Sequence, residues 1–142
     1  MAGGDSKVPH PLSFRVRYPY KPDKRGVSVP VSLISGTETV KLFASVDTGA
    51  EYCLFERGFA EALLIEPEQG TRLDFETVTG TFRAWGHELT LDILGVRTHA
   101  VVYFFDNPEI KKNVLGRNGW LNRVRLGVVD HDLFVYLSAY DD

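Results

Sequence analysis

A mostly apolar run in this chain is followed directly by an aspartate and a tight turn. Residues 42–46 have the apolar character of a strand, and Asp47, Thr48, Gly49 and Ala50 follow at once. Gly49 lets the backbone turn sharply where a side chain would collide. An ionised carboxylate in such apolar company needs several donors, and the Thr48 hydroxyl and the main-chain N–H groups past Gly49 are nearest. The same residues are also typical of an ordinary turn that is capped by the acid, so only the rest of the chain can indicate whether Asp47 has a function.

The chain is long enough for one hydrophobic core. With 142 residues, we expect a single domain over residues 13–142, preceded by a disordered leader at residues 1–12. No apolar run is long enough to cross a bilayer, and the first residues lack the apolar segment of a secretory signal. The only cysteine, Cys53, fits a reducing compartment, so we expect a cytoplasmic protein with no membrane partner.

Charge and residue spacing argue against several other classes of function. The formal net charge is -3 with both signs scattered, which argues against a nucleic-acid partner. The histidines at positions 10, 87, 99 and 131 lie too far apart to show metal-ligand spacing. Cys53, between Tyr52 and Leu54, suits a small buried side chain better than a nucleophile. We expect no metal and no cofactor.

Alternating apolar and polar residues predict a chain made mostly of strands. The expected strands are 14–18, 27–34, 39–46, 73–79, 81–90 with a further alternating stretch at 89–94, 100–105, 125–130 and 133–137. A short helix is expected from Phe55 to a stop near Pro67, and another around Trp120, Leu121 and Val124. The pattern is typical of an all-β domain with one or two short helices.

Three features, in this order and separation, resemble those of retropepsin-like aspartic proteases, in particular the small stand-alone prokaryotic type. They are the strand-borne turn 47–50, a hairpin tipped by Gly80 in the place of the family's flap, and the motif 114–116 followed by Arg117. Each has an ordinary structural explanation, but none of these explanations predicts the other two. The resemblance extends over residues 18–137 and implies a single-lobe acid-protease fold, a closed barrel that assembles as a homodimer.

The resemblance implies an aspartic endopeptidase that acts on peptide or protein substrates. The family uses two aspartates, one deprotonating a water while the other, protonated, donates to the scissile carbonyl oxygen. This sequence has one Asp-Thr-Gly and is too short for two lobes, so a two-fold axis would bring two copies of Asp47 together. The pair would share one proton. Because Ala50 offers it no hydroxyl, we expect a mildly acidic to near-neutral optimum.

Residues beside the acid receive supporting roles from the same resemblance. Thr48 would bond across to the partner's loop, and Gly49 would permit close approach at the axis. Glu51 and Arg117 stand where the family has an ion pair that braces the active-site loop next to Gly116, although the usual acid there is Asp. Breaking such a pair would cost about 3 kcal/mol if it is partly buried. A solvated pair contributes at most about 1 kcal/mol.

The hairpin 76–85 would be the flap that closes over a substrate and holds it extended through main-chain hydrogen bonds. The candidate flap and substrate-binding residues are Val78, Thr79, Gly80, Thr81, Phe82 and Trp85. Ile110 is a further candidate for the pocket. An aromatic residue on a strand is more often part of the core than of a pocket, so pocket contact by the two aromatic residues stays open.

A second interpretation keeps the fold but removes the catalysis. In it the chain is a catalytically weak or inactive module for dimerisation or for binding extended peptides. The first interpretation is favoured because every residue that the chemistry needs is present, and a purely structural domain gains nothing from a costly carboxylate pair on its axis. The strands 14–18 and 133–137 are the candidates for sealing the dimer.

Overall fold

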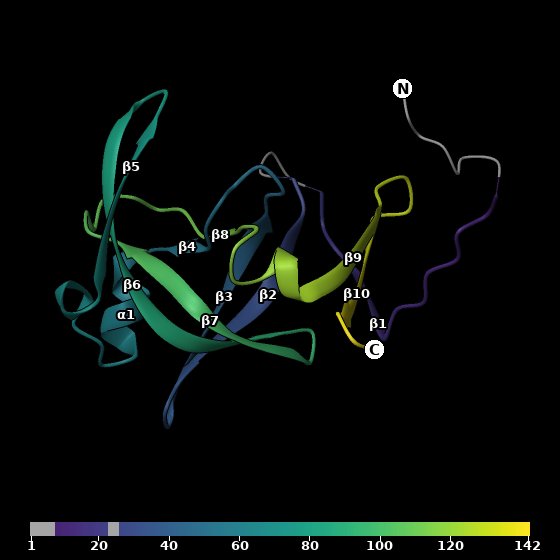
Figure 1. The fold of residues 1–142 in the computed structure, drawn as a ribbon, viewed down its shortest axis with the longest axis horizontal. Coiled ribbons are helices and arrows are strands. Elements are labelled where there is room, and N and C mark those ends of the chain that lie inside the picture. Colours follow the sequence, from purple (N-terminus) through teal and green to yellow (C-terminus); the bar gives the residue numbers. More distant parts are fainter. Residues whose placement is uncertain (1–7, 23–25) are drawn as a thin grey trace.

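The fold is known from a computed structural model, and the structure describes residues 8–22 and 26–142. The strands are β1 (Val16–Pro19), β2 (Ser28–Ser35), β3 (Glu38–Val46), β4 (Leu54–Phe55), β5 (Thr71–Thr77), β6 (Gly80–Ile93), β7 (Val96–Phe105), β8 (Val114–Leu115), β9 (Val124–Val129) and β10 (Phe134–Ala139). The helical elements in these ranges are α1 (Arg57–Ala62) and the 3₁₀ turns η1 (Pro67–Gln69) and η2 (Leu121–Arg123). The prediction of an all-β domain is therefore confirmed (Figure 1).

The larger sheet closes on itself. Its strands follow the order β2-β3-β8-β4-β7-β6-β5, and β2 also pairs with β6 through Ser32 to Ile34. Alternate residues of β2 are buried, so Val29, Val31 and Leu33 point into the enclosed core while their neighbours face outward. This closure leaves β5 outside the ring, paired only with β6.

A smaller antiparallel sheet carries both ends of the described chain. Its order is β1-β10-β9, so the predicted strand at 14–18 and the closing hairpin come together. Val135 and Leu137 of β10 are buried and belong to the same core cluster as the larger sheet. Figure 1 shows this sheet beside the strands β2 and β3, away from the β5 end of the molecule.

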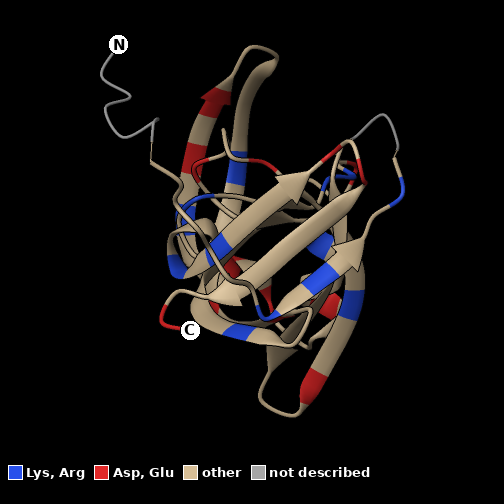
Figure 2. Cartoon of the chain, turned by 90° about the vertical axis from the view of Figure 1, so that its right-hand side faces the viewer, with Lys and Arg blue, Asp and Glu red and all other residues tan. Residues whose placement is uncertain are grey.

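Charged residues of both signs are spread over the surface. Figure 2 shows Lys and Arg interspersed with Asp and Glu along the strands, as the sequence predicted. Among the described residues, no helix is long and apolar enough to cross a membrane.

Several predicted boundaries are wrong. Phe55 is not helical but lies in β4, where it pairs in parallel with Phe104, and the helix begins only at Arg57. Val124 starts β9, because the preceding turn is a short 3₁₀ helix and not an α-helix. Residues 8–12 of the predicted leader carry no helix or strand, and residues 1–7 lie outside the described part of the chain.

Candidate functional site

Asp47 stands at the end of β3, held by the strand beside it. β3 runs parallel to β8, and the Asp47 N–H donates to the carbonyl of Leu115 at 3.0 Å. The turn closes when Ala50 N–H donates to the Asp47 carbonyl at 3.2 Å. The carboxylate Oδ1 accepts the N–H of Gly49 at 2.9 Å. This donor is the N–H of Gly49 itself, whereas the sequence had suggested the Thr48 hydroxyl and the N–H groups beyond Gly49.

A second loop is fastened onto this turn by main-chain bonds. Arg117 N–H donates to the Ala50 carbonyl and Asn118 N–H to the Glu51 carbonyl, both at 2.8 Å. A Cβ on Gly116 would lie 2.2 Å from the Tyr52 carbonyl oxygen and 2.8 Å from that of Ala50. Only glycine permits this approach, so the predicted supporting role of Gly116 has a steric basis.

Asp47 is exposed in the single chain, together with Thr48 and Gly49. The expectation that the acid is surrounded by apolar residues is therefore wrong for one chain. The apolar side chains of β3 that precede it point alternately inward and outward, and the turn lifts the carboxylate beyond the end of the core.

A cavity of about 780 Å³ opens beside the turn. Predicted residues that line it are Asp47, Gly49, Ala50, Glu51, Val78, Thr79, Phe82 and Ile110. Thr48, Gly80, Thr81, Trp85, Gly116 and Arg117 do not line it. Glu76 and Thr77, from the predicted flap 76–85, line it too. Lining residues that the sequence did not indicate are Tyr52, Leu54, Phe75, Phe105, Lys111, Lys112 and Val114. Their alternation with polar strand neighbours looks like ordinary core patterning, and only the folded pairing of β4, β7 and β8 gathers them.

The β5–β6 hairpin projects over the cavity from one side. Residues 80–83 of β6 pair only with β5, because the pairing with β7 begins at Ala84 and Phe105. At the tip, Thr77 pairs with Gly80, whose φ is 141°, and the hydroxyls of Thr77 and Thr79 lie 3.0 Å apart. Figure 1 shows this end standing clear of the barrel. The predicted hairpin is present, but its turn is formed by Val78 and Thr79, whereas Gly80 and Thr81, expected at the tip, are the first residues of β6.

The predicted ion pair between Glu51 and Arg117 is absent from the described structure. Both side chains are exposed, and the two loops are joined through their backbones instead. Partial burial, and then the negative charge of the Glu51 carboxylate, raises the pKa of the Tyr52 phenol. The neighbouring loop thus needs no salt bridge to hold its position in one chain.

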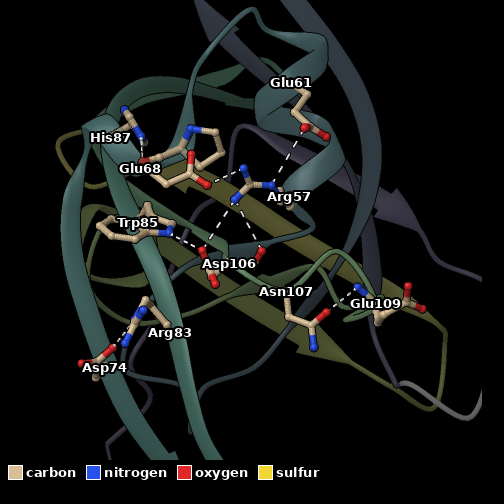
Figure 3. Close-up of polar contacts among 11 residues, drawn as sticks. Arg57, Glu61, Glu68, Asp74, Arg83, Trp85, His87, Asp106, Asn107 and Glu109 are labelled. Carbon is tan, nitrogen blue, oxygen red and sulfur yellow. Dashed lines mark hydrogen bonds and ion pairs between the residues drawn. The ribbon is translucent and has the colours of Figure 1, made fainter.

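Trp85 fixes the base of the hairpin and leaves the cavity to Phe82. Its indole N–H donates to the Asp106 carboxylate at 2.8 Å, and Arg57 Nη1 lies 3.7 Å from the same oxygen. Arg57 also contacts Glu68 at 2.5 Å, which helps to lower the pKa of that carboxyl. Figure 3 shows Arg57 between these acids, with Trp85 above Asp106. In the single chain, Trp85 does not line the cavity.

Other reactive groups are placed for structure. Cys53 is fully buried, and burial raises the pKa of its thiol to about 11, which suits packing and not nucleophilic attack. Across residues 8–22 and 26–142, no group of three or more His, Cys, Asp or Glu side chains is placed to hold a metal ion.

No family model matches the sequence, and no curated protein matches it.

Proposed function

We propose that the chain is a homodimeric aspartic endopeptidase with a retropepsin-like fold, in which each copy supplies one Asp47. One observation carries the proposal. An exposed Asp47 carboxylate stands on a turn held by main-chain bonds, at the edge of a cavity over which a hairpin projects. Such an arrangement presents a rigidly positioned acid to a bound chain, which is the geometry that hydrolysis by a carboxylate pair requires.

The reaction follows from two carboxylates that share one proton. The ionised Asp47 removes a proton from a water as that water attacks the scissile carbonyl carbon. The protonated partner donates its proton to the carbonyl oxygen, so a neutral gem-diol forms. Proton transfer to the amide nitrogen and cleavage of the C–N bond then release a carboxylic acid and an amine, and the net reactant is one water.

The second acid must come from a second copy. The other acids that line the cavity are Glu51 and Glu76, at the far side of the turn and on the hairpin. Glu51 follows the Asp47 turn in the next loop, and Glu76 is carried on β5 opposite Thr81. Neither is carried by a second copy of the Asp47 turn, whereas a two-fold axis beside the exposed residues 47–49 would supply such a copy.

The small sheet offers edges for sealing such a dimer. Its outer strands are β1 and β9, and Val128 and Val129 of β9 are 44% and 41% exposed. An unpaired strand edge with exposed apolar side chains favours addition of a strand from another copy. This refines the expectation from sequence, because β10 lies in the middle of that sheet and β1 and β9 are its free edges.

The hairpin would hold the substrate as an extended chain. The exposed residues 77–79 of the hairpin line the same cavity as the Asp47 turn. Closure of two such hairpins would exclude water and bring main-chain groups to the peptide. Phe75 and Phe82, whose rings lie 5.8 Å apart, would provide apolar contact beneath it.

The test compares wild type with Asp47→Asn, which keeps the size of the side chain but removes its acid. Wild type is expected to cleave members of a peptide library between pH 4 and pH 7, and the variant is expected to lose cleavage while keeping the dimer in sedimentation. Equal cleavage by both proteins assigns the activity elsewhere. A monomer at all concentrations contradicts the shared acid pair. Binding without cleavage at any pH favours the inactive peptide-binding module.

A further inference from the structure

Two exposed lysines add positive charge to the cavity. Lys111 and Lys112 line it from the segment that leads into β8. Lys111 Nζ lies 3.9 Å from Glu56 Oε1, so part of its charge is already matched. Lys112 makes no ion pair with any residue in the described ranges, although it shares the cavity with two glutamates. An unmatched ammonium in a largely apolar cavity is a ready partner for a carboxylate.

Main-chain bonds fix the position of Lys112 relative to the catalytic turn. The Ser45 N–H donates to the Asn113 carbonyl at 2.9 Å, and the Leu115 carbonyl receives the Asp47 N–H. Lys112 therefore lies three residues before Leu115, whose carbonyl binds the Asp47 N–H. Three residues of extended chain span about 10 Å. An extended substrate along the same wall covers that distance in about three residues.

The negative side chains of the cavity lie on other elements. Glu51 follows the Asp47 turn and acts on Tyr52, and Glu76 is carried by β5 on the hairpin. The cavity is therefore polarised, with acids on the turn and the hairpin and a cation on the wall before β8. Its remaining lining is mainly apolar, including Leu54, Phe105 and Ile110.

We propose that Lys112 selects substrates that carry an aspartate or glutamate within three residues of the scissile bond. This inference rests on the proposed peptide-binding function of the cavity, and it adds a charge preference that catalysis by the acid pair does not require. An exposed ion pair of this kind corresponds to a preference of about threefold to fivefold for Asp over Asn, and a Lys at the same position is disfavoured further.

The experiment measures binding in the full chain with Asp47→Asn, so that no peptide is consumed. The probes are fluorescent eight-residue peptides with Phe-Leu at the centre and alanine elsewhere, carrying Asp, Asn or Lys at one of the three positions on either side. Their dissociation constants are measured by anisotropy at pH 6. At one position or more, Asp is expected to bind about threefold to fivefold better than Asn.

Two further substitutions in the same background identify the residue responsible. Lys112→Glu is expected to reverse the order, so that the Lys peptide binds best at that position. Lys41→Glu makes the same charge change at an exposed lysine outside this cavity, so it is the matched control and is expected to keep the preference for Asp. The melting temperature of each variant shows that it is folded.

The outcomes separate this inference from the protease proposal. Equal binding of the three peptides at all positions overturns the inference, as does a preference that survives Lys112→Glu or a failure of every peptide to bind. Cleavage that depends on Asp47 but ignores substrate charge leaves the protease standing without the Lys112 preference. Charge-dependent binding without cleavage by wild type supports the Lys112 site and removes the protease.

Discussion

Replacing Gly116 by alanine tests the close approach of the two loops that carry the site. The new Cβ would lie 2.2 Å from the Tyr52 carbonyl oxygen and 2.6 Å from its carbon, both backbone atoms. Restoring an ordinary contact requires a shift of about 1 Å between the loops. Overpacking against groups that cannot rotate away costs about 3 kcal/mol. For a domain of this size, that lowers Tm by about 10 °C.

The same shift is expected to reduce activity more than stability alone explains. The Ala50 carbonyl bonds to the loop that would move, so the Asp47 turn moves with it. A misplacement of about 1 Å reduces kcat/KM by about a hundredfold. The assay combines thermal unfolding followed by circular dichroism with cleavage rates well below Tm, where the variant is folded.

Two other glycines provide matched controls. A Cβ on Gly58, in α1, meets nothing within 4 Å, so Gly58→Ala is expected to stabilise the chain by about 0.5 kcal/mol. A Cβ on Gly70 would lie 2.2 Å from the Gly86 carbonyl, a clash of the same size outside the cavity. Gly70→Ala is expected to lower Tm comparably while kcat falls far less. If Gly116→Ala melts and cleaves like wild type, or if both clashing variants lose kcat equally, the reasoning fails.

Three further changes test the surroundings of the site. Trp85→Phe removes the hydrogen bond to Asp106, and we expect KM to rise with kcat little changed, as steady-state kinetics would show, because the hairpin loses its anchor. Hydrogen bonds from Arg72 and Arg83 lower the pKa of Asp74, so the contacts that join the two strands of the hairpin through Asp74 are fully present above the ordinary pKa of an aspartate and are lost as the pH falls through the lowered pKa. Hydrogen exchange at the hairpin tip is expected to rise as the pH falls through that range. In Asp74→Asn the exchange is expected to be raised already at pH 6. The hydrogen bond to Asp130, and then burial, raises the pKa of Tyr20 to about 12, so the contribution of Tyr20 to the free energy of unfolding is full below pH 10 and is lost as the pH rises toward 12. Denaturant unfolding is expected to show this loss of stability at alkaline pH in wild type but not in Tyr20→Phe.

The strand pattern was readable from the sequence because burial alternates along it. Residues 27–34 and 89–94 alternate in sequence, and the buried positions of β2 and β6 alternate in the same way. The two-residue strands β4 and β8 were not predictable, because they are too short to show a periodicity of their own. Their parallel partners are distant in sequence: Leu54 pairs with Tyr103, and Val114 pairs with Ser45. Phe55 was assigned to a helix for that reason.

The site was predictable where the backbone dictates the residue type. Steric limits require glycine at position 116, and main-chain hydrogen bonds hold the Asp47 turn. Such backbone requirements restrict the residue types, so a short sequence motif is enough to predict them. The absence of the Glu51–Arg117 ion pair was not predictable, because both side chains are exposed and their rotamers depend on solvent and not on the turn. Lys112 escaped notice because nothing in the segment before β8 distinguishes it from a solvated lysine.

This division between backbone and side chains has a consequence for the proposed chemistry. A carboxylate pair that shares a proton works only where one acid is ionised and the other is not, so its geometry must survive mild acidity. Main-chain bonds from Leu115, Ala50 and Arg117 do not titrate, and they hold the turn whatever the pH. The acid that clamps the hairpin, Asp74, has a lowered pKa because Arg72 and Arg83 donate hydrogen bonds to it, so it keeps its charge into more acidic solution than an ordinary aspartate. The turn and the base of the hairpin are therefore held by contacts that mild acidity does not remove, which is what the proposed chemistry requires of its scaffold.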